Sequence, residues 1–97
     1  MLPLGYHRSY WTEALHQYRW YQARGSGLGN EFLDEVGRTL GEIEANPYRF
    51  ALATATIRRG QVNRFPFSIY YRIRVDHIRI LSVMHNSRGF TGWKHRR

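Results

Sequence analysis

The chain has 97 residues, no cysteine and a formal net charge of +8 at pH 7, and this charge is unevenly divided. Residues 1–57 hold 5 Lys or Arg against 6 Asp or Glu, whereas residues 58–97 hold 10 against 1, which favours contact with polyanions such as nucleic acid. The composition excludes a disulfide framework and a thiolate site, and no pattern of a secretion signal or membrane span is present. We therefore expect one cytoplasmic domain over residues 1–97, with no metal, no cofactor and no membrane contact.

The first half of the chain predicts two helices. The first runs from Ser9 to about Arg24, with one apolar face made by Trp11, Ala14, Leu15, Tyr18 and Tyr21. A tight connection at residues 25–27, which contain two glycines, separates it from a second helix. The second helix runs from Leu28 to about Ala45, where Asn46-Pro47 ends it, and its buried face is Phe32, Val36, Leu40 and Ile43. So short a connection predicts an antiparallel helical hairpin.

After Pro47 the apolar period changes from 3.6 to 2, which predicts strands. We expect a first strand from Thr54 to Arg59, ended by Gly60, and a second from Phe67 to Arg74. A turn near Val75 and Asp76 leads to a third strand from His77 to His85. The tail from Asn86 to Arg97 is expected to be a loop or a short helical turn over the sheet edge. The predicted fold class is α+β, with an N-terminal helical hairpin packed on a small antiparallel β-sheet.

Alternation assigns the side chains of the last two strands to faces. In the second strand one face holds Phe67, Ile69, Tyr71 and Ile73, and the other holds Ser68, Tyr70 and Arg72. In the third strand the predicted faces are Ile78, Ile80 and Met84 on one side and Leu81, Val83 and His85 on the other. A strand that is apolar on both faces is expected at the centre of the sheet.

Six segments of the chain together form a recognisable series. They are Trp20-Tyr21, Leu28-Gly29 with Phe32, Asn46-Pro47, Ile57-Arg58-Arg59, the strand RFPFSIYYRI from Arg64 to Ile73, and Val83-Met84-His85 with Arg88 and Trp93. In this order they resemble the RelE/ParE superfamily of bacterial toxins. The resemblance implies a fold similar to that of small microbial ribonucleases and a toxin of a type II toxin-antitoxin module. It also implies a cognate antitoxin as partner, with operator DNA bound only through the toxin-antitoxin complex.

Members of the superfamily split by target, and the fold does not decide between the targets. RelE-like toxins cut messenger RNA on the ribosome, and ParE-like toxins inhibit DNA gyrase without being enzymes. Our first hypothesis is a metal-independent mRNA endonuclease, and our second is a gyrase inhibitor. A third is a regulatory nucleic-acid-binding protein that represses its own operon with its partner. Ser68 favours the second hypothesis, because RelE-like enzymes place an arginine early in this strand.

The endonuclease hypothesis assigns chemistry to particular residues. The 2′-hydroxyl needs a base, the pentavalent phosphate needs cations and the leaving oxygen needs an acid. The predicted catalytic residues are His85, Arg64 and Arg88. Arg64 is considered as a replacement for the arginine that RelE-like enzymes have where this chain has Ser68. The predicted nucleic-acid contacts are Arg58, Arg59, Arg72, Tyr70, Lys94 and Arg96.

Each of these residues also has a structural alternative. His85 caps the end of its strand, Tyr70 packs against a neighbour, Trp93 pins the tail, and the arginines form a solvated docking face. The other histidines are too scattered for a metal site. We further expect one contiguous cationic surface backed by the helices, with the antitoxin covering a groove near Arg58, Arg64, His85 and Arg88.

Overall fold

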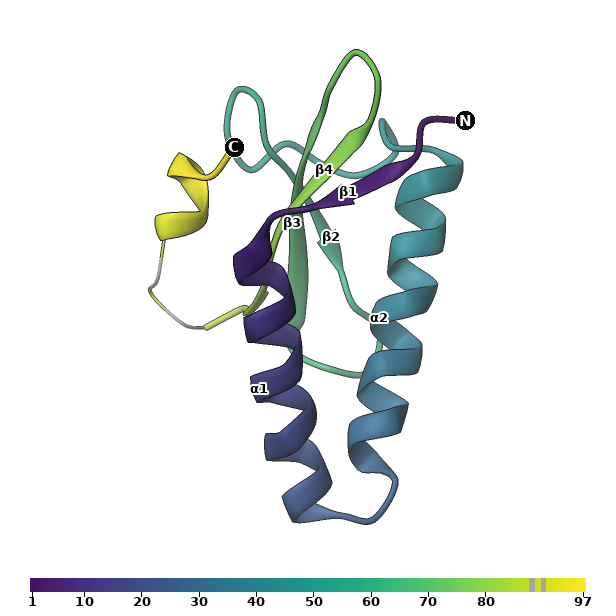
Figure 1. The fold of residues 1–97 in the computed structure, drawn as a ribbon, viewed down its shortest axis with the longest axis vertical. Coiled ribbons are helices and arrows are strands. Elements are labelled where there is room, and N and C mark those ends of the chain that lie inside the picture. Colours follow the sequence, from purple (N-terminus) through teal and green to yellow (C-terminus); the bar gives the residue numbers. More distant parts are fainter. Residues whose placement is uncertain (88, 90) are drawn as a thin grey trace.

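A computed structural model of the chain describes residues 1–87, 89 and 91–97. The elements are β1 (Leu4–Tyr6), α1 (Arg8–Arg24), α2 (Leu28–Ala45), β2 (Arg58–Gln61), β3 (Phe67–Ile73), β4 (Ile78–His85) and the 3₁₀ helix η1 (Gly92–His95). The strands form one sheet in the order β1-β4-β3-β2, and the two helices stand side by side as a hairpin (Figure 1). The predicted α+β fold, both helices and the last two strands are confirmed. The described helices are not long and apolar enough to cross a membrane.

The sheet is mixed rather than purely antiparallel, because it contains a strand, β1, that was not predicted from the sequence. This strand pairs in parallel with β4, from Leu4 opposite Ile78 to Tyr6 opposite Ile80. Three residues are too few to show an alternating pattern, so β1 carries no signal of its own. Its addition makes β4 a central strand over that stretch only, and α1 follows directly after His7.

The first predicted strand, Thr54 to Arg59, is displaced towards the C-terminus in the structure. The hydroxyl of Thr54 accepts a hydrogen bond from the backbone N–H of Ile57 at 3.0 Å, and this local turn competes with strand pairing. Gly60, expected to end the strand, is a buried position inside β2 opposite Ile69. A Cβ atom on Gly60 would lie 3.3 Å from Ile43 of α2, so the missing side chain allows β2 to approach the helix.

A bulge in β4 changes which residues face the helices. Tyr70 of β3 pairs with Ser82, but the next residue, Tyr71, pairs with Ile80, so Leu81 has no partner across the ladder. As a result Ile80 and Val83, which were predicted on opposite faces, both belong to the core beneath the helices. Leu81 instead packs with Trp93 in a second, smaller core. The face assignment for β4 was therefore wrong, whereas the one for β3 is confirmed.

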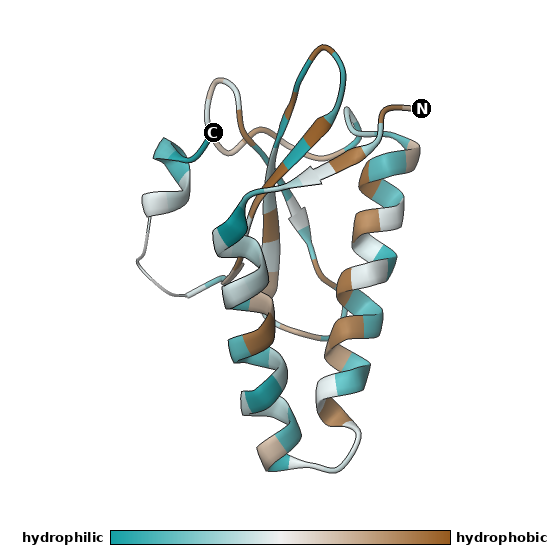
Figure 2. Cartoon of the chain, viewed as in Figure 1, coloured by the Kyte–Doolittle hydropathy of each residue, from teal (hydrophilic) through white to brown (hydrophobic). Residues whose placement is uncertain are grey.

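The core between helices and sheet is rich in aromatic rings. Phe32 of α2 meets Phe65 and Phe67 edge to face, with centroids 5.5 and 5.2 Å apart, and Tyr21 of α1 packs on all three rings. Along α1 the ribbon in Figure 2 is mostly hydrophilic, while brown segments recur along α2 and β4. The buried face predicted for α2 is confirmed.

The buried face of α1 is rotated from the predicted one. Its buried residues are Tyr10, Ala14 and Gln17, whereas Trp11 and Leu15 are 58% and 47% exposed. Packing of α1 against β1 and β4 decides this orientation. Tyr10 lies in the core, and the centroid of its ring is 5.0 Å from that of Tyr6 in β1.

The two helices approach closely at Gly29. A Cβ atom there would lie 2.6 Å from the carbonyl oxygen of Tyr18 in α1. We predict that Gly29→Ala lowers the free energy of unfolding by about 1–3 kcal/mol through overpacking. Gly37→Ala, on the same helix with nothing within 4 Å of the new Cβ, is the control and should raise it by about 0.5–1 kcal/mol. Urea unfolding of both variants measures this, and equal effects would contradict the close approach.

His7 caps α1 in its neutral form. Its Nδ1 accepts a hydrogen bond from the backbone N–H of Ser9 at 3.1 Å, and burial together with the charges of Arg96 and Arg79 lowers the pKa of His7. Below the ordinary histidine pKa of about 6.5, the unfolded chain takes up a proton that the folded chain resists, so acid favours unfolding.

We predict that His7→Asn, a capping residue that does not titrate, reduces the loss of stability on acidification from about pH 7 to pH 5. At neutral pH the variant and the original chain should unfold at similar denaturant concentrations. Chemical denaturation at the two pH values measures the difference, and parallel losses in both proteins would show that His7 does not titrate with unfolding.

Candidate functional site

The C-terminal tail lies over the face of the sheet that points away from the helices. The ring of Trp93 in η1 stacks on that of Tyr70 in β3, with centroids 3.8 Å apart and planes 16° apart. Arg72, also in β3, donates from Nε to the main-chain oxygen of Arg96 at 3.2 Å and from a terminal nitrogen to that of Lys94 at 3.1 Å. The tail is thus pinned to the sheet, as the structural alternative for Trp93 proposed.

Arg96, a predicted nucleic-acid contact, lies inside the protein at the bulge. Its terminal nitrogen donates to the carboxylate of Glu13 in α1 at 2.9 Å and to the carbonyl oxygen of Leu81 at 3.0 Å. Its side chain is 15% exposed and that of Glu13 is 18% exposed. The hydroxyl of Ser82 donates to the same carboxylate at 2.9 Å. Arg96 therefore satisfies the backbone oxygen that the bulge leaves outside the ladder.

A cleft beside the tail brings together three of the predicted nucleic-acid contacts. Arg59 from β2, Tyr70 from β3 and Lys94 from η1 all line it, and both cations are exposed. Arg59 is oriented by its Nε, which donates to the hydroxyl of Ser68 at 2.9 Å. That hydroxyl also contacts Asn86 at 2.6 Å, so Ser68 is a fully buried link between two strands and the loop after β4.

Arg58 lies on the other face of the sheet. It pairs with Tyr71, whose ring is in the core beneath the helices, and its guanidinium donates to the carbonyl oxygens of Phe50 at 2.7 Å and Tyr48 at 3.3 Å. These bonds fasten the loop after α2 to the sheet. Burial raises the pKa of the Tyr71 hydroxyl to about 12, and that hydroxyl donates to the carbonyl oxygen of Pro47 at 2.6 Å.

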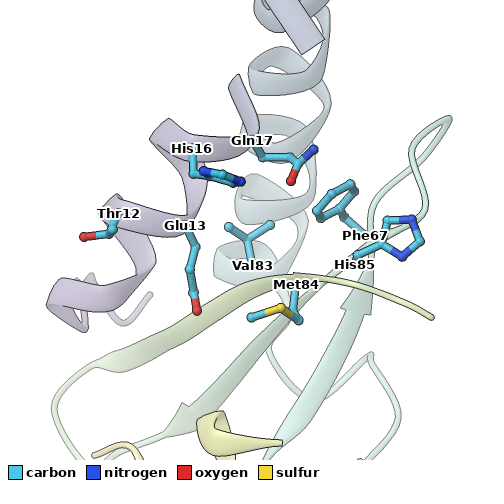
Figure 3. A pocket seen from close by; sticks show the side chains of 8 residues that line it. All are labelled: Thr12, Glu13, His16, Gln17, Phe67, Val83, Met84 and His85. Carbon is cyan, nitrogen blue, oxygen red and sulfur yellow. The ribbon is translucent and has the colours of Figure 1, made fainter. Parts of the chain in front are cut away.

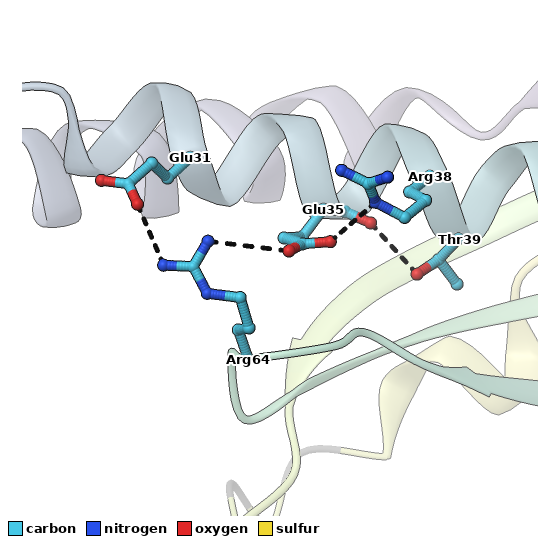
Figure 4. A network of polar contacts seen from close by, with 5 residues as sticks. All are labelled: Glu31, Glu35, Arg38, Thr39 and Arg64. Carbon is cyan, nitrogen blue, oxygen red and sulfur yellow. Dashed lines mark hydrogen bonds and ion pairs between the residues drawn. The ribbon is translucent and has the colours of Figure 1, made fainter.

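Arg64 points at α2 from the turn between β2 and β3. Its φ of 69° lies in the left-handed region, and its guanidinium contacts the carboxylates of Glu31 at 2.9 Å and Glu35 at 3.7 Å (Figure 4). The hydrogen bond that Arg64 donates to the Glu31 carboxylate raises the pKa of Arg64, so its guanidinium stays charged and bound to α2. Glu35 also accepts from Arg38 at 3.0 Å.

His85 lies at the end of β4 next to α1. Its Nδ1 accepts from the backbone N–H of Ser87 at 3.1 Å, and its ring meets that of Phe67 with centroids 5.1 Å apart. His85 lines a cleft of about 410 Å³ together with Glu13, His16, Gln17, Phe67, Val83 and Met84 (Figure 3). It also lines a second cleft, with His16, Gln17, Trp20 and Tyr21. Within the described residues, no arginine lines either of these clefts.

The predicted site residues are therefore divided among several places. Arg59, Tyr70, Arg72 and Lys94 gather on the sheet face beneath the tail, whereas Arg58, Arg64 and His85 are each held elsewhere. Arg88 falls outside the described residues. The single groove expected near Arg58, Arg64 and His85 is not found in the described part of the chain. Arg58 is bonded to the loop after α2, Arg64 to the carboxylates of α2, and His85 lies beside α1.

A group of three arginines and one histidine around the turn between β3 and β4 was not predicted from the sequence. Arg74, His77, Arg79 and Arg97 line an open cleft there. Their alternation across the predicted turn was the available signal, because a tight hairpin brings the flanking residues of two strands together. Over the described positions, no group of three or more His, Cys, Asp or Glu residues is arranged to hold a metal ion.

Comparisons with known proteins identify the fold. No family model and no curated protein matches the chain. A chain of a solved structure, the chromosomal ParDE TA system from P. aeruginosa, is similar over 88% of this chain and 96% of that one, with 18% sequence identity and a TM-score of 0.77. This chain has the same fold as that structure. At this identity the likeness confirms the predicted resemblance at the level of the fold.

We predict that Trp93→Ala lowers the free energy of unfolding by about 3–5 kcal/mol, because a buried ring that joins the tail to Tyr70 and Leu81 is lost. Trp20→Ala is the matched control, since Trp20 is 41% exposed on α1, and its effect should be clearly smaller. Urea unfolding compares the two. A Trp93 variant as stable as the original chain would show that this ring does not hold the tail on the sheet.

Proposed function

We propose that this chain is the toxin component of a type II toxin-antitoxin module. The observation that supports this is the RelE/ParE fold over most of the chain, shared with a protein whose structure is described as a ParDE TA system. The resemblance of the sequence motifs points the same way. In this proposal an antitoxin encoded beside the toxin neutralises it, and operator DNA is bound only by the complex of the two.

We further propose that the toxin acts by docking on DNA gyrase, as ParE-like proteins do, rather than by cutting RNA. Cleavage through the 2′-hydroxyl requires a proton carrier and a cation at one phosphate. Among the described residues His85 lines clefts without arginine, and Arg64 is bound by two carboxylates of α2. These placements favour the non-enzymatic hypothesis, in agreement with Ser68.

The endonuclease remains the second candidate because of the cleft beside the tail. There Arg59 and Lys94 present two exposed cations in a cleft that Tyr70 also lines, and exposed cations are suited to a phosphate. Histidine does not line this cleft in the described part of the chain, so a proton carrier would have to be another group. Ribosome and mRNA are the partners in this alternative, and gyrase is the partner in the first.

For the antitoxin we propose the cleft between α1 and the end of β4. Its lining combines the apolar side chains of Phe67, Val83 and Met84 with His16 and His85 (Figure 3). An amphipathic segment that folds on contact would bury apolar side chains there, and its acidic residues would meet the basic half of the chain. Of the residues around which the antitoxin was expected to bind, this proposal keeps only His85.

Two assays run side by side test the target. Purified toxin is added to a translation reaction with labelled messenger and, separately, to a gyrase supercoiling reaction. We expect intact messenger and inhibited supercoiling, with His85→Ala as active as the original chain because His85 has no chemical role in this proposal.

Codon-spaced cuts in the messenger that disappear in Arg59→Ala or His85→Ala would overturn the gyrase proposal and support the endonuclease. If neither reaction responds, while the chain together with its antitoxin represses the operon, the toxin proposal itself is wrong. Adding the antitoxin to an active reaction should restore it, and this serves as the internal control for specificity.

A further inference from the structure

The turn between β3 and β4 carries a concentration of positive charge outside the surface considered so far. Arg74 and His77 flank the two-residue turn, Arg79 lies on β4 and Arg97 reaches the same cleft from the tail. The hairpin that carries the turn projects beyond the rest of the sheet at the top of Figure 1. The one carboxylate bonded to this group in the described residues is Asp76, which contacts Nδ1 of His77 at 2.7 Å.

Two of these side chains are held in place by the fold. The guanidinium of Arg79 donates to the main-chain oxygen of Tyr6 in β1 at 3.0 Å and to that of Arg97 at 3.3 Å. The ring of His77 lies against Gly5, where a Cβ atom would come 3.0 Å from the ring. A larger residue at position 5 would therefore push against the ring of His77. The glycine lets β1 pair with β4 while His77 keeps its place in the cleft.

The other two side chains are free to meet a ligand. Arg74 and Arg97 are exposed, and over the described residues neither side chain has a hydrogen bond or ion pair. Their terminal N–H groups are therefore available donors. The guanidinium of Arg79, held by its own hydrogen bonds, lines the same cleft as a third cation. Exposed guanidinium groups whose N–H donors are not bonded within the fold form a natural site for oxyanions, because each can donate two parallel hydrogen bonds.

The sheet holds arginine side chains close together at this end although their positive charges repel one another. Arg72 and Arg79 are directly opposite each other on β3 and β4, a position where like charges destabilise a sheet. Burial, and then the nearby charges of Arg74 and Arg97, lower the pKa of Arg72. Folding alone does not favour so many cations at one end of a sheet, and an anionic ligand would remove the conflict.

We propose that Arg74, His77, Arg79 and Arg97 form a site for the phosphodiester backbone of a nucleic acid. The cleft is open and no Phe, Tyr or Trp ring lines it among the described residues, so we expect it to contact phosphates rather than to stack on bases. A free phosphate and a nucleotide share the same chemistry, but they favour enclosed sites rather than a projecting hairpin. The proposal concerns contact with phosphates of any sequence, which is distinct from the binding of operator DNA by the toxin-antitoxin complex, and it is independent of the toxin's target.

The test measures the affinity of the full chain for a short labelled DNA duplex over a range of potassium chloride concentrations. We expect the double variant Arg74→Gln, Arg97→Gln to bind more weakly by about tenfold or more at low salt. The slope of log affinity against log salt should fall by about 2, since each lost phosphate contact contributes about 0.9. Both residues are exposed and unpaired in the described structure, so the fold should be unaffected.

The matched control is Arg19→Gln, Arg24→Gln, which removes the same charge from the end of α1 furthest from the hairpin (Figure 1). Its slope should stay close to that of the original chain. Equal losses in both double variants would overturn the proposal, because binding would then follow net charge alone. Inorganic phosphate or a single nucleotide that binds as tightly as the duplex would also overturn it, as would a polyglutamate peptide that binds more tightly than the duplex and loses affinity only in the hairpin variant.

Discussion

The bulge at Leu81 allows one strand to serve two cores. Without it, strict alternation in β4 would place Ile80 and Val83 on opposite faces, and the helical hairpin would lose one of them. With the extra residue, both side chains face the helices and Leu81 faces the tail. The bulge leaves one carbonyl oxygen outside the ladder, and Arg96 satisfies it. The position of the tail therefore follows from the irregularity of this strand.

The same region joins the three parts of the molecule electrostatically. Glu13 of α1 accepts from Arg96 of the tail and from Ser82 of β4, so helix, sheet and tail share one largely buried carboxylate. Removing one partner of such a pair leaves the other charge buried and uncompensated, which costs more than the pair contributes. This is why a C-terminal arginine that resembles a ligand-binding group in the sequence is a structural residue in the fold.

The negative charge of the first half of the chain has a defined place in the structure. Glu31 and Glu35 lie on the side of α2 that faces the turn after β2, where they hold Arg64. The fold thus withdraws one of the predicted catalytic cations from the basic half, while Lys94 and Arg59 stay exposed on the opposite face. Charge that is segregated along the sequence is partly recombined in space, and what remains uncompensated is divided between the tail cleft and the β3–β4 hairpin.

Periodicity was sufficient for the long elements and insufficient for the irregular ones. Both helices, β3, most of β4 and the turn at Val75 and Asp76 follow from spacing and turn chemistry. β1 is too short to have a period, and the start of β2 is decided by a hydrogen bond of Thr54. At the bulge Leu81 packs with Trp93, which is distant in sequence, so no local pattern reveals which face Leu81 takes. The same limit applies to the candidate site. Which face of the sheet Arg58 and Arg59 lie on depends on the register of β2, and the sequence did not predict that register.

The distribution of cations bears on how such a small protein can act. Catalysis needs its groups within one hydrogen-bonded cluster, whereas docking tolerates contacts spread over a surface. In the described residues the cations are spread along the outer face of the sheet and around the hairpin, and the largely apolar cleft at His85 lies beside α1. The paired arginines across β3 and β4 are costly to folding in isolation, and that cost is easiest to understand if the protein works in contact with an anionic surface.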